Sequence, residues 1–86
     1  MTLDQRIQEL VAVGAAITAN CHPCLQYHVS KAVESGAEPE EIADAVAVGK
    51  MVRKGAASKT DQFAASLIST LAPAATAAED GCGCSS

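Results

Sequence analysis

The sequence predicts an all-α fold, built from a helical hairpin and two further helices, that assembles into an oligomer. Apolar residues recur at helical spacing in four segments of the 86-residue chain, and no segment has a convincing strand pattern. Hydrophobic residues make up 49% of the composition but aromatic residues only 2%, and alanine is the commonest type. Because small side chains pack helices closely but bury little area in a monomer, we expect identical subunits to cover one another.

The first helix is predicted to begin at Thr2-Leu3-Asp4-Gln5, which has the form of a capping box. Its apolar residues follow at helical spacing: Leu3, Ile7, Leu10, Gly14 and Ile17. Almost every residue from Leu10 to Ala19 is small or apolar. We therefore expect this half of the helix to be buried on several sides, including at subunit contacts.

The second helix is predicted from about Cys21 to Ser35, with Gly36 as the residue that stops it. Asn20 either closes the first helix or caps the second. Pro23 suits the first turn of a helix, where its missing N–H costs nothing. The short connection makes the two helices a tight hairpin.

A third helix is predicted to begin at Pro39, with acidic residues in its first turn, and to end before Gly55. Its last turns carry three basic residues: Lys50, Arg53 and Lys54. Residues 58–61 resemble another helix start, and Pro73 stops this fourth helix. The apolar face of the fourth helix consists of Phe63, Leu67, Ile68 and Leu71.

The composition changes after residue 72 to alanine, threonine, glycine, serine and acidic residues, with few large apolar side chains. We therefore predict one helical domain at residues 1–72 and a flexible tail at residues 73–86, which carries Cys82-Gly83-Cys84.

The charge pattern argues against nucleic acid and anionic membranes as partners, because both select clustered Lys and Arg. The net charge is −4, the pI is near 4.9, and the basic residues are scattered. The sequence has no secretory signal pattern, and no apolar run reaches the ~18 residues that could span a bilayer. We expect a cytoplasmic protein. It shows no nucleotide-binding fingerprint, so no cofactor is predicted, and reducing equivalents must come from another protein or a small thiol.

Four cysteines stand in two close pairs, which are poor spacings for stapling a fold together and favour redox or metal chemistry. Cys21 and Cys24 share one turn at the predicted start of the second helix, where the helix dipole favours a thiolate. One sulfur can then act as nucleophile and the other as its resolving partner. His28 lies one helical turn beyond Cys24, on the same face, and is placed to move a proton.

Two other functions remain open. The first is a soft-metal module that binds zinc or copper through Cys21, Cys24, His28 and the tail cysteines Cys82 and Cys84. The second is a non-catalytic helical assembly in which the cysteines are incidental.

The spacing of four residues gives a resemblance to a known family. Glu9, Cys21, Cys24 and His28 stand at Glu-x11-Cys-x2-Cys-x3-His. This pattern resembles the alkylhydroperoxidase (AhpD-like) branch of the carboxymuconolactone decarboxylase family, and residues 30–45 are similar to that family's turn into the next helix. The resemblance implies an all-helical fold, assembly into trimers or hexamers, and antioxidant peroxidase or thiol-disulfide oxidoreductase activity.

Carried onto this chain, the resemblance implies that Cys24 attacks a hydroperoxide or disulfide substrate and that Cys21 resolves the intermediate as a disulfide. It also implies a proton relay through His28 and Glu9, joined by water. Peroxidases of the family often have a histidine immediately before the second cysteine, where this chain has Pro23.

The tail cysteines Cys82 and Cys84 are predicted to act as a redox shuttle. A linker from Pro73 to Gly81 is long enough to bring them to the Cys21–Cys24 disulfide of the same or an adjacent subunit. The alternative is an end with incidental thiols or a metal-scavenging Cys-x-Cys.

Overall fold

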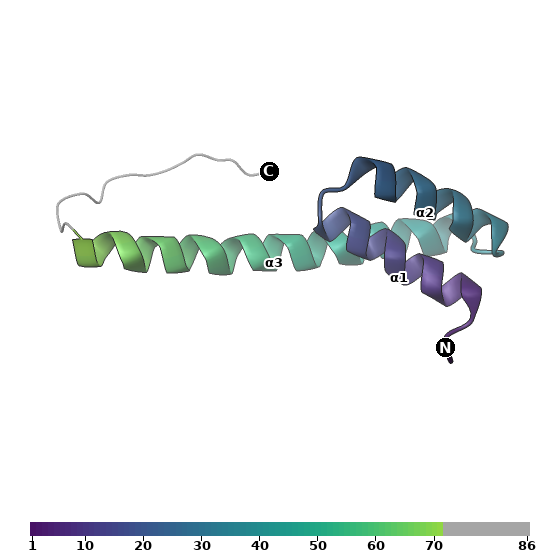
Figure 1. The fold of residues 1–86 in the computed structure, drawn as a ribbon, viewed down its shortest axis with the longest axis horizontal. Helices are drawn as coiled ribbons and strands as arrows, with labels where there is room; N and C mark the ends of the chain where they lie inside the picture. The colour runs from purple at the N-terminus through teal and green to yellow at the C-terminus, as the bar shows by residue number, and fades with distance from the viewer. Residues whose placement is uncertain (72–86) are drawn as a thin grey trace. The chain divides into compact units, whose positions relative to one another are not determined.

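The computed structural model describes residues 1–71 and shows three helices there: α1 (Gln5–Thr18), α2 (His22–Glu34) and α3 (Pro39–Leu71) (Figure 1). No strand occurs in these residues, and the predicted all-α class is confirmed. The chain divides into two compact units, Met1–Lys54 and Gly55–Ser86. The predicted tail at 73–86, with Cys82 and Cys84, lies outside the described residues.

The first helix begins later than predicted. Asp4 is its N-cap, because its carboxylate accepts the Ile7 N–H at 2.9 Å, so the cap is not Thr2. An aspartate at this position is at least as good a cap as threonine, and it also places a negative charge at the helix N-terminus.

Only one side of α1 is buried within the chain. Val13, Ala16 and Ile17 are buried, but Val11 is 60% exposed and Ala15 is exposed as well. Within one chain, α2 and the start of α3 leave the opposite side of α1 uncovered, so the expected burial of residues 10–19 on several sides stays a prediction that depends on subunit contacts.

The turn between α1 and α2 settles the role of Asn20. Its φ of +56° is in the left-handed region, and its N–H donates to the Ile17 carbonyl at 3.1 Å, so Asn20 ends α1. Cys21 follows as the N-cap of α2. Gly36, with φ +93°, ends α2 as predicted.

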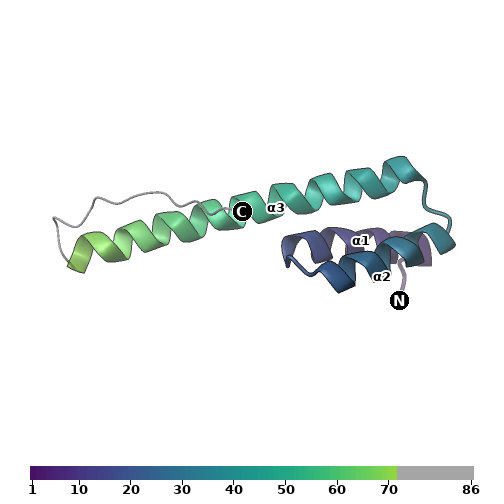
Figure 2. The ribbon, with the colours of Figure 1, turned by 90° about the horizontal axis from the view of Figure 1, so that it is seen from above.

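The helices of the hairpin lie side by side, with the first part of α3 against them (Figure 1 and Figure 2). Val13 and Ala32 are fully buried between α1 and α2, and Ala37 joins them from the connection to α3. Partly buried apolar residues surround this cluster: Leu10, Leu25, Val29, Ile42, Ala45 and Val46. The small side chains let the hairpin close tightly enough for polar groups on α1 and α2 to meet.

Two glycines bring α1 and α3 into close contact. A Cβ added at Gly49 would lie 2.5 Å from the Gly14 carbonyl oxygen and 2.8 Å from the Ile17 Cβ. The hydroxyl of Thr18 bridges the crossing, with the Gly14 oxygen at 3.0 Å and the Gly49 oxygen at 3.2 Å. Gly49 therefore permits close helix contact.

The predicted third and fourth helices are one continuous helix, α3, and the break expected at Gly55 is wrong. Gly55 has an ordinary helical φ and open space around it, so it only lowers the stability of the helix by about 1 kcal/mol relative to alanine. The hydroxyl of Thr60 donates to the Ala56 carbonyl at 3.0 Å, within the helix, so residues 58–61 do not cap a new one. None of the helices described in residues 1–71 is long and apolar enough to cross a membrane.

Candidate active site

A disulfide joins Cys21 and Cys24 at the start of α2, with a Cα–Cα distance of 5.3 Å. The Cys21 sulfur also accepts the Cys24 N–H at 3.3 Å, and Pro23 occupies the first turn of the helix. Cys24 is exposed, whereas Cys21 is half-buried. After reduction, both sulfurs would lie at the positive end of the α2 dipole, which favours the thiolate of either one.

Glu9 and His28 form a direct contact across the hairpin. The Glu9 Oε1 lies 2.7 Å from the His28 Nδ1, and the two side chains are 17% and 31% exposed. The family resemblance implied a water between them. No water is needed, because the small residues between α1 and α2 bring the two helices close together. A carboxylate that accepts the Nδ1 proton fixes the ring and leaves Nε2 to exchange protons.

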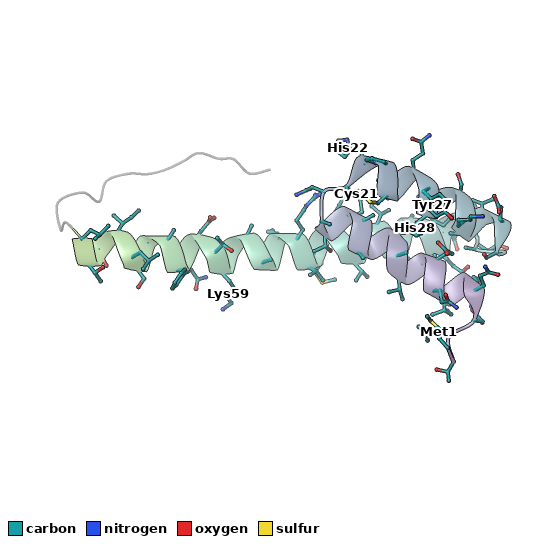
Figure 3. The ribbon with its side chains drawn as sticks, viewed as in Figure 1. Met1, Cys21, His22, Tyr27, His28 and Lys59 are labelled. Atoms are coloured by element: carbon teal, nitrogen blue, oxygen red, sulfur yellow. A yellow bond between two sulfur atoms is a disulfide. The ribbon has the colours of Figure 1, made fainter. Side chains whose placement is uncertain are left out.

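His28 lies one turn after Cys24 on the same face of α2, so its ring is on the cysteine side of the helix. The Tyr27 ring packs edge-on against it, with centroids 5.0 Å apart, and Lys31 lies 5.6 Å above the Tyr27 ring. Figure 3 shows Cys21 where α1 leads into α2, with Tyr27 and His28 further along α2. These neighbours restrict the orientation of the imidazole.

A small cavity of about 110 Å³ adjoins Cys21. Its lining consists of Ala16, Ile17, Asn20, Cys21, His22, Leu25 and Arg53. Arg53 reaches over from α3 and donates through Nη1 to the Asn20 side chain at 2.9 Å and the Ile17 carbonyl at 3.3 Å. The guanidinium therefore holds the turn that carries Cys21.

Arg53 is the residue of this region that sequence reasoning missed. Its sequence context suggested only a positive charge near a helix end. The available signal was its position one turn after Gly49, because residues four apart share a face of α3.

The structure thus places the four motif residues on one hairpin as two pairs, Glu9 with His28 and Cys21 with Cys24. His22 is exposed and points away from the hairpin (Figure 3). Within residues 1–71, no three His, Cys, Asp or Glu side chains are placed to hold a metal ion. The predicted shuttle cysteines, Cys82 and Cys84, lie beyond this part of the chain.

Comparison with known proteins gives two matches. The model of the carboxymuconolactone decarboxylase family matches residues 2–66. A protein of Paracoccus denitrificans named "Uncharacterized protein 4 in cox locus" is 40% identical over 55 residues, which cover 64% of this chain and 50% of that protein. The chain thus matches about half the length of this curated relative. No solved structure shows a significant match.

Proposed function

Because the chain belongs to the carboxymuconolactone decarboxylase family, we propose that it is an enzyme of the alkylhydroperoxidase-like branch. Its activity is thiol-disulfide oxidoreduction, in which the Cys21–Cys24 dithiol reduces a hydroperoxide or a disulfide. The observation that carries the proposal is the 2.7 Å contact between Glu9 and His28 on the hairpin that also bears the disulfide. A histidine that a carboxylate orients, one helical turn from a dithiol, is placed for the proton transfer that thiol chemistry requires.

The oxidative half of the reaction starts from the reduced dithiol. The Cys24 thiolate attacks one oxygen of the hydroperoxide, the O–O bond breaks, and the alcohol leaves with a proton while Cys24 becomes a sulfenic acid. The Cys21 thiolate then attacks the Cys24 sulfur, and water leaves as the disulfide forms. Two thiols are oxidised and one hydroperoxide is reduced. The exposure of Cys24 supports its assignment as the attacking sulfur.

His28 moves the protons in both steps. With its Nδ1 proton held by Glu9, the ring accepts a proton from the Cys24 thiol through Nε2 and returns it to the leaving oxygen. Glu9 stabilises the imidazolium that forms in between, because its carboxylate lies at hydrogen-bond distance. The role of Glu9 is thus to orient and balance the charge of His28.

The reductive half needs a protein or small-thiol reductant, which regenerates the dithiol by disulfide exchange. A cytoplasmic location supplies such thiols. Cys82 and Cys84 act as a shuttle that passes electrons to Cys21–Cys24, because tethering raises their local concentration at the disulfide, and a variant without them tests this role.

The enzyme acts as a homo-oligomer, a trimer or a hexamer. An apolar groove of about 450 Å³ runs between α1 and the first part of α3, and Val11, Val48 and Val52 line it while exposed by half or more. In its second half, α3 exposes four large apolar residues: Phe63, Leu67, Ile68 and Leu71. Subunit contacts that bury these surfaces would supply apolar burial that the small core of one chain lacks.

The test is a thiol count by mass spectrometry before and after treatment with an alkyl hydroperoxide, with metal content measured on the same sample. The proposal predicts a metal-free protein that loses two thiols per chain to a Cys21–Cys24 disulfide. A stoichiometric metal that blocks this oxidation would instead support the soft-metal module. Thiols that persist under excess hydroperoxide would exclude the peroxidase.

A further inference from the structure

Arg53 carries a positive charge that no carboxylate neutralises within residues 1–71. Its two hydrogen bonds, to the Asn20 side chain and the Ile17 carbonyl, both come from Nη1 and both go to uncharged oxygens. The three ion pairs of the described residues involve other cations. A guanidinium has five N–H donors in a planar fork, so Nε and Nη2 retain donors that can hold an acidic group.

The cavity beside this guanidinium adjoins one cysteine of the disulfide and not the other. Cys21 lines it, and Cys24 does not. A molecule that enters the cavity therefore meets Cys21 first, so the cavity suits the step in which a reductant attacks the disulfide. It does not adjoin Cys24, the sulfur proposed to meet the hydroperoxide.

The lining is divided between apolar and polar residues. Ala16, Ile17 and Leu25 form an apolar wall, and Asn20 and Arg53 supply polar groups. A volume of about 110 Å³ holds three to four groups of the size of a water molecule, at ~30 Å³ each. This combination fits a short methylene chain that ends in an acidic group.

We propose, on the basis of the function proposed above, that this cavity binds the carboxylate of a small acidic thiol, and that Arg53 holds this carboxylate while the thiol reduces the Cys21–Cys24 disulfide. The guanidinium favours an anionic ligand, and the apolar wall favours a ligand with a methylene chain. The position of Cys21 in the lining places the disulfide within reach of the ligand's thiol.

The reaction balances with two molecules of this thiol. The first thiolate attacks the Cys21 sulfur, the Cys21–Cys24 bond breaks, and Cys24 leaves as a thiolate at the positive end of the α2 dipole. The second thiolate attacks the sulfur of the bound thiol in the mixed disulfide, and Cys21 leaves as a thiolate. Two small thiols are oxidised to their disulfide, and the protein disulfide is reduced to the dithiol.

The experiment compares two thiols that differ only in charge, mercaptopropionate and its neutral amide, as reductants of the oxidised full-length protein. Their second-order rate constants are corrected for the thiolate fraction of each reagent. An ion pair at a half-exposed site gives mercaptopropionate a preference of roughly fivefold to tenfold in the wild type. The preference falls to about one in Arg53→Gln, is partly kept in Arg53→Lys, and shrinks as salt is added.

Lys50→Gln is the matched control. It removes the same charge from the same helix, but Lys50 is exposed and does not line the cavity, so it should keep the preference of the wild type. Arg53 also holds the turn through Asn20 and Ile17, so Arg53→Gln could disturb the turn itself. The rate with the neutral amide measures this disturbance, because the amide carries no charge for Arg53 to bind.

Two results would overturn the proposal: a wild-type protein that reacts equally well with both thiols, or an Arg53→Gln variant slowed equally toward both. The second result would reduce Arg53 to a structural role. Because this assay starts from the disulfide and uses no hydroperoxide, its failure is separate from a failure of the peroxidase, which the thiol count detects.

Discussion

Gly49→Ala is predicted to destabilise the protein, because the added methyl group has no space at the crossing of α1 and α3. It would lie 2.5 Å from the Gly14 carbonyl oxygen and 2.8 Å from the Ile17 Cβ. The carbonyl is backbone and cannot rotate away, so the helices must separate. Overpacking of this kind costs about 1–3 kcal/mol. Because the nearest atom belongs to the backbone, we expect a cost in the upper part of this range, and alanine recovers ~1 kcal/mol in helix propensity, which leaves a net loss of about 1–2 kcal/mol.

Thermal unfolding followed by circular dichroism measures this loss. In a domain of this size, each kcal/mol corresponds to a fall in Tm of about 4–8 °C. All variants are compared at one protein concentration, because an oligomer's apparent stability depends on it. The displacement also moves Arg53, one turn further along α3, away from the turn that carries Cys21.

Gly55→Ala is the control, because it makes the same change in the same helix at a place with no atom within 4 Å of the new methyl group. We expect it to stabilise the protein by about 0.5–1 kcal/mol. Opposite signs for the two variants support the packing argument. A Gly49→Ala variant as stable as the wild type would refute the argument for the crossing, and a destabilised Gly55→Ala variant would refute it for the continuous helix.

Three further predictions concern the relay, an ion pair and the tail. Glu9→Gln and His28→Gln should each slow disulfide formation by an alkyl hydroperoxide about 100-fold in stopped-flow measurements, and wild-type rates in both would contradict the relay. The Glu38 N–H donates to the Glu41 carboxylate and lowers its pKa, and Arg6 lowers the same pKa less strongly. The stability that this carboxylate contributes is therefore present at neutral pH and lost as the pH falls through its lowered pKa. Arg6→Gln should thus lower Tm slightly at pH 7 and not in acid, and an equal fall in Tm at both pH values would contradict this pH dependence. Deletion of residues 81–86 should slow reduction of the active-site disulfide by a protein reductant while leaving its formation by hydroperoxide unchanged, and an unchanged reduction rate would remove the shuttle.

The hairpin was predictable because its signals are local. The apolar spacing of α1, the glycine at position 36 and the proline at position 23 each act within a few residues. The same holds for the spacing of Glu9, Cys21, Cys24 and His28, since the connection is too short for any arrangement but a hairpin. The length of the Glu9–His28 contact was not predictable, because it depends on how closely the small residues let α1 and α2 approach.

The end of the third helix was predicted wrongly because local propensity was given too much weight. Gly55 resembles a helix end and the polar residues 58–61 resemble a helix start. A glycine with ordinary helical φ only weakens a helix, however, and serine and threonine hydroxyls can donate to carbonyls of the preceding turn. The role of Arg53 depends on the tertiary crossing at Gly49, and its position one turn after that glycine was the signal available in the sequence.

The measurement that tests the redox account most directly is the first oxidation step in Cys21→Ser and Cys24→Ser, each reduced and then mixed with one equivalent of alkyl hydroperoxide. The sulfenic acid is captured with a dimedone-type reagent and located by mass spectrometry. The account predicts that Cys21→Ser accumulates a sulfenic acid at Cys24, because the resolving sulfur is missing, and that Cys24→Ser reacts no faster than an ordinary thiol. Equal initial oxidation of the two variants, or none in either, would contradict it.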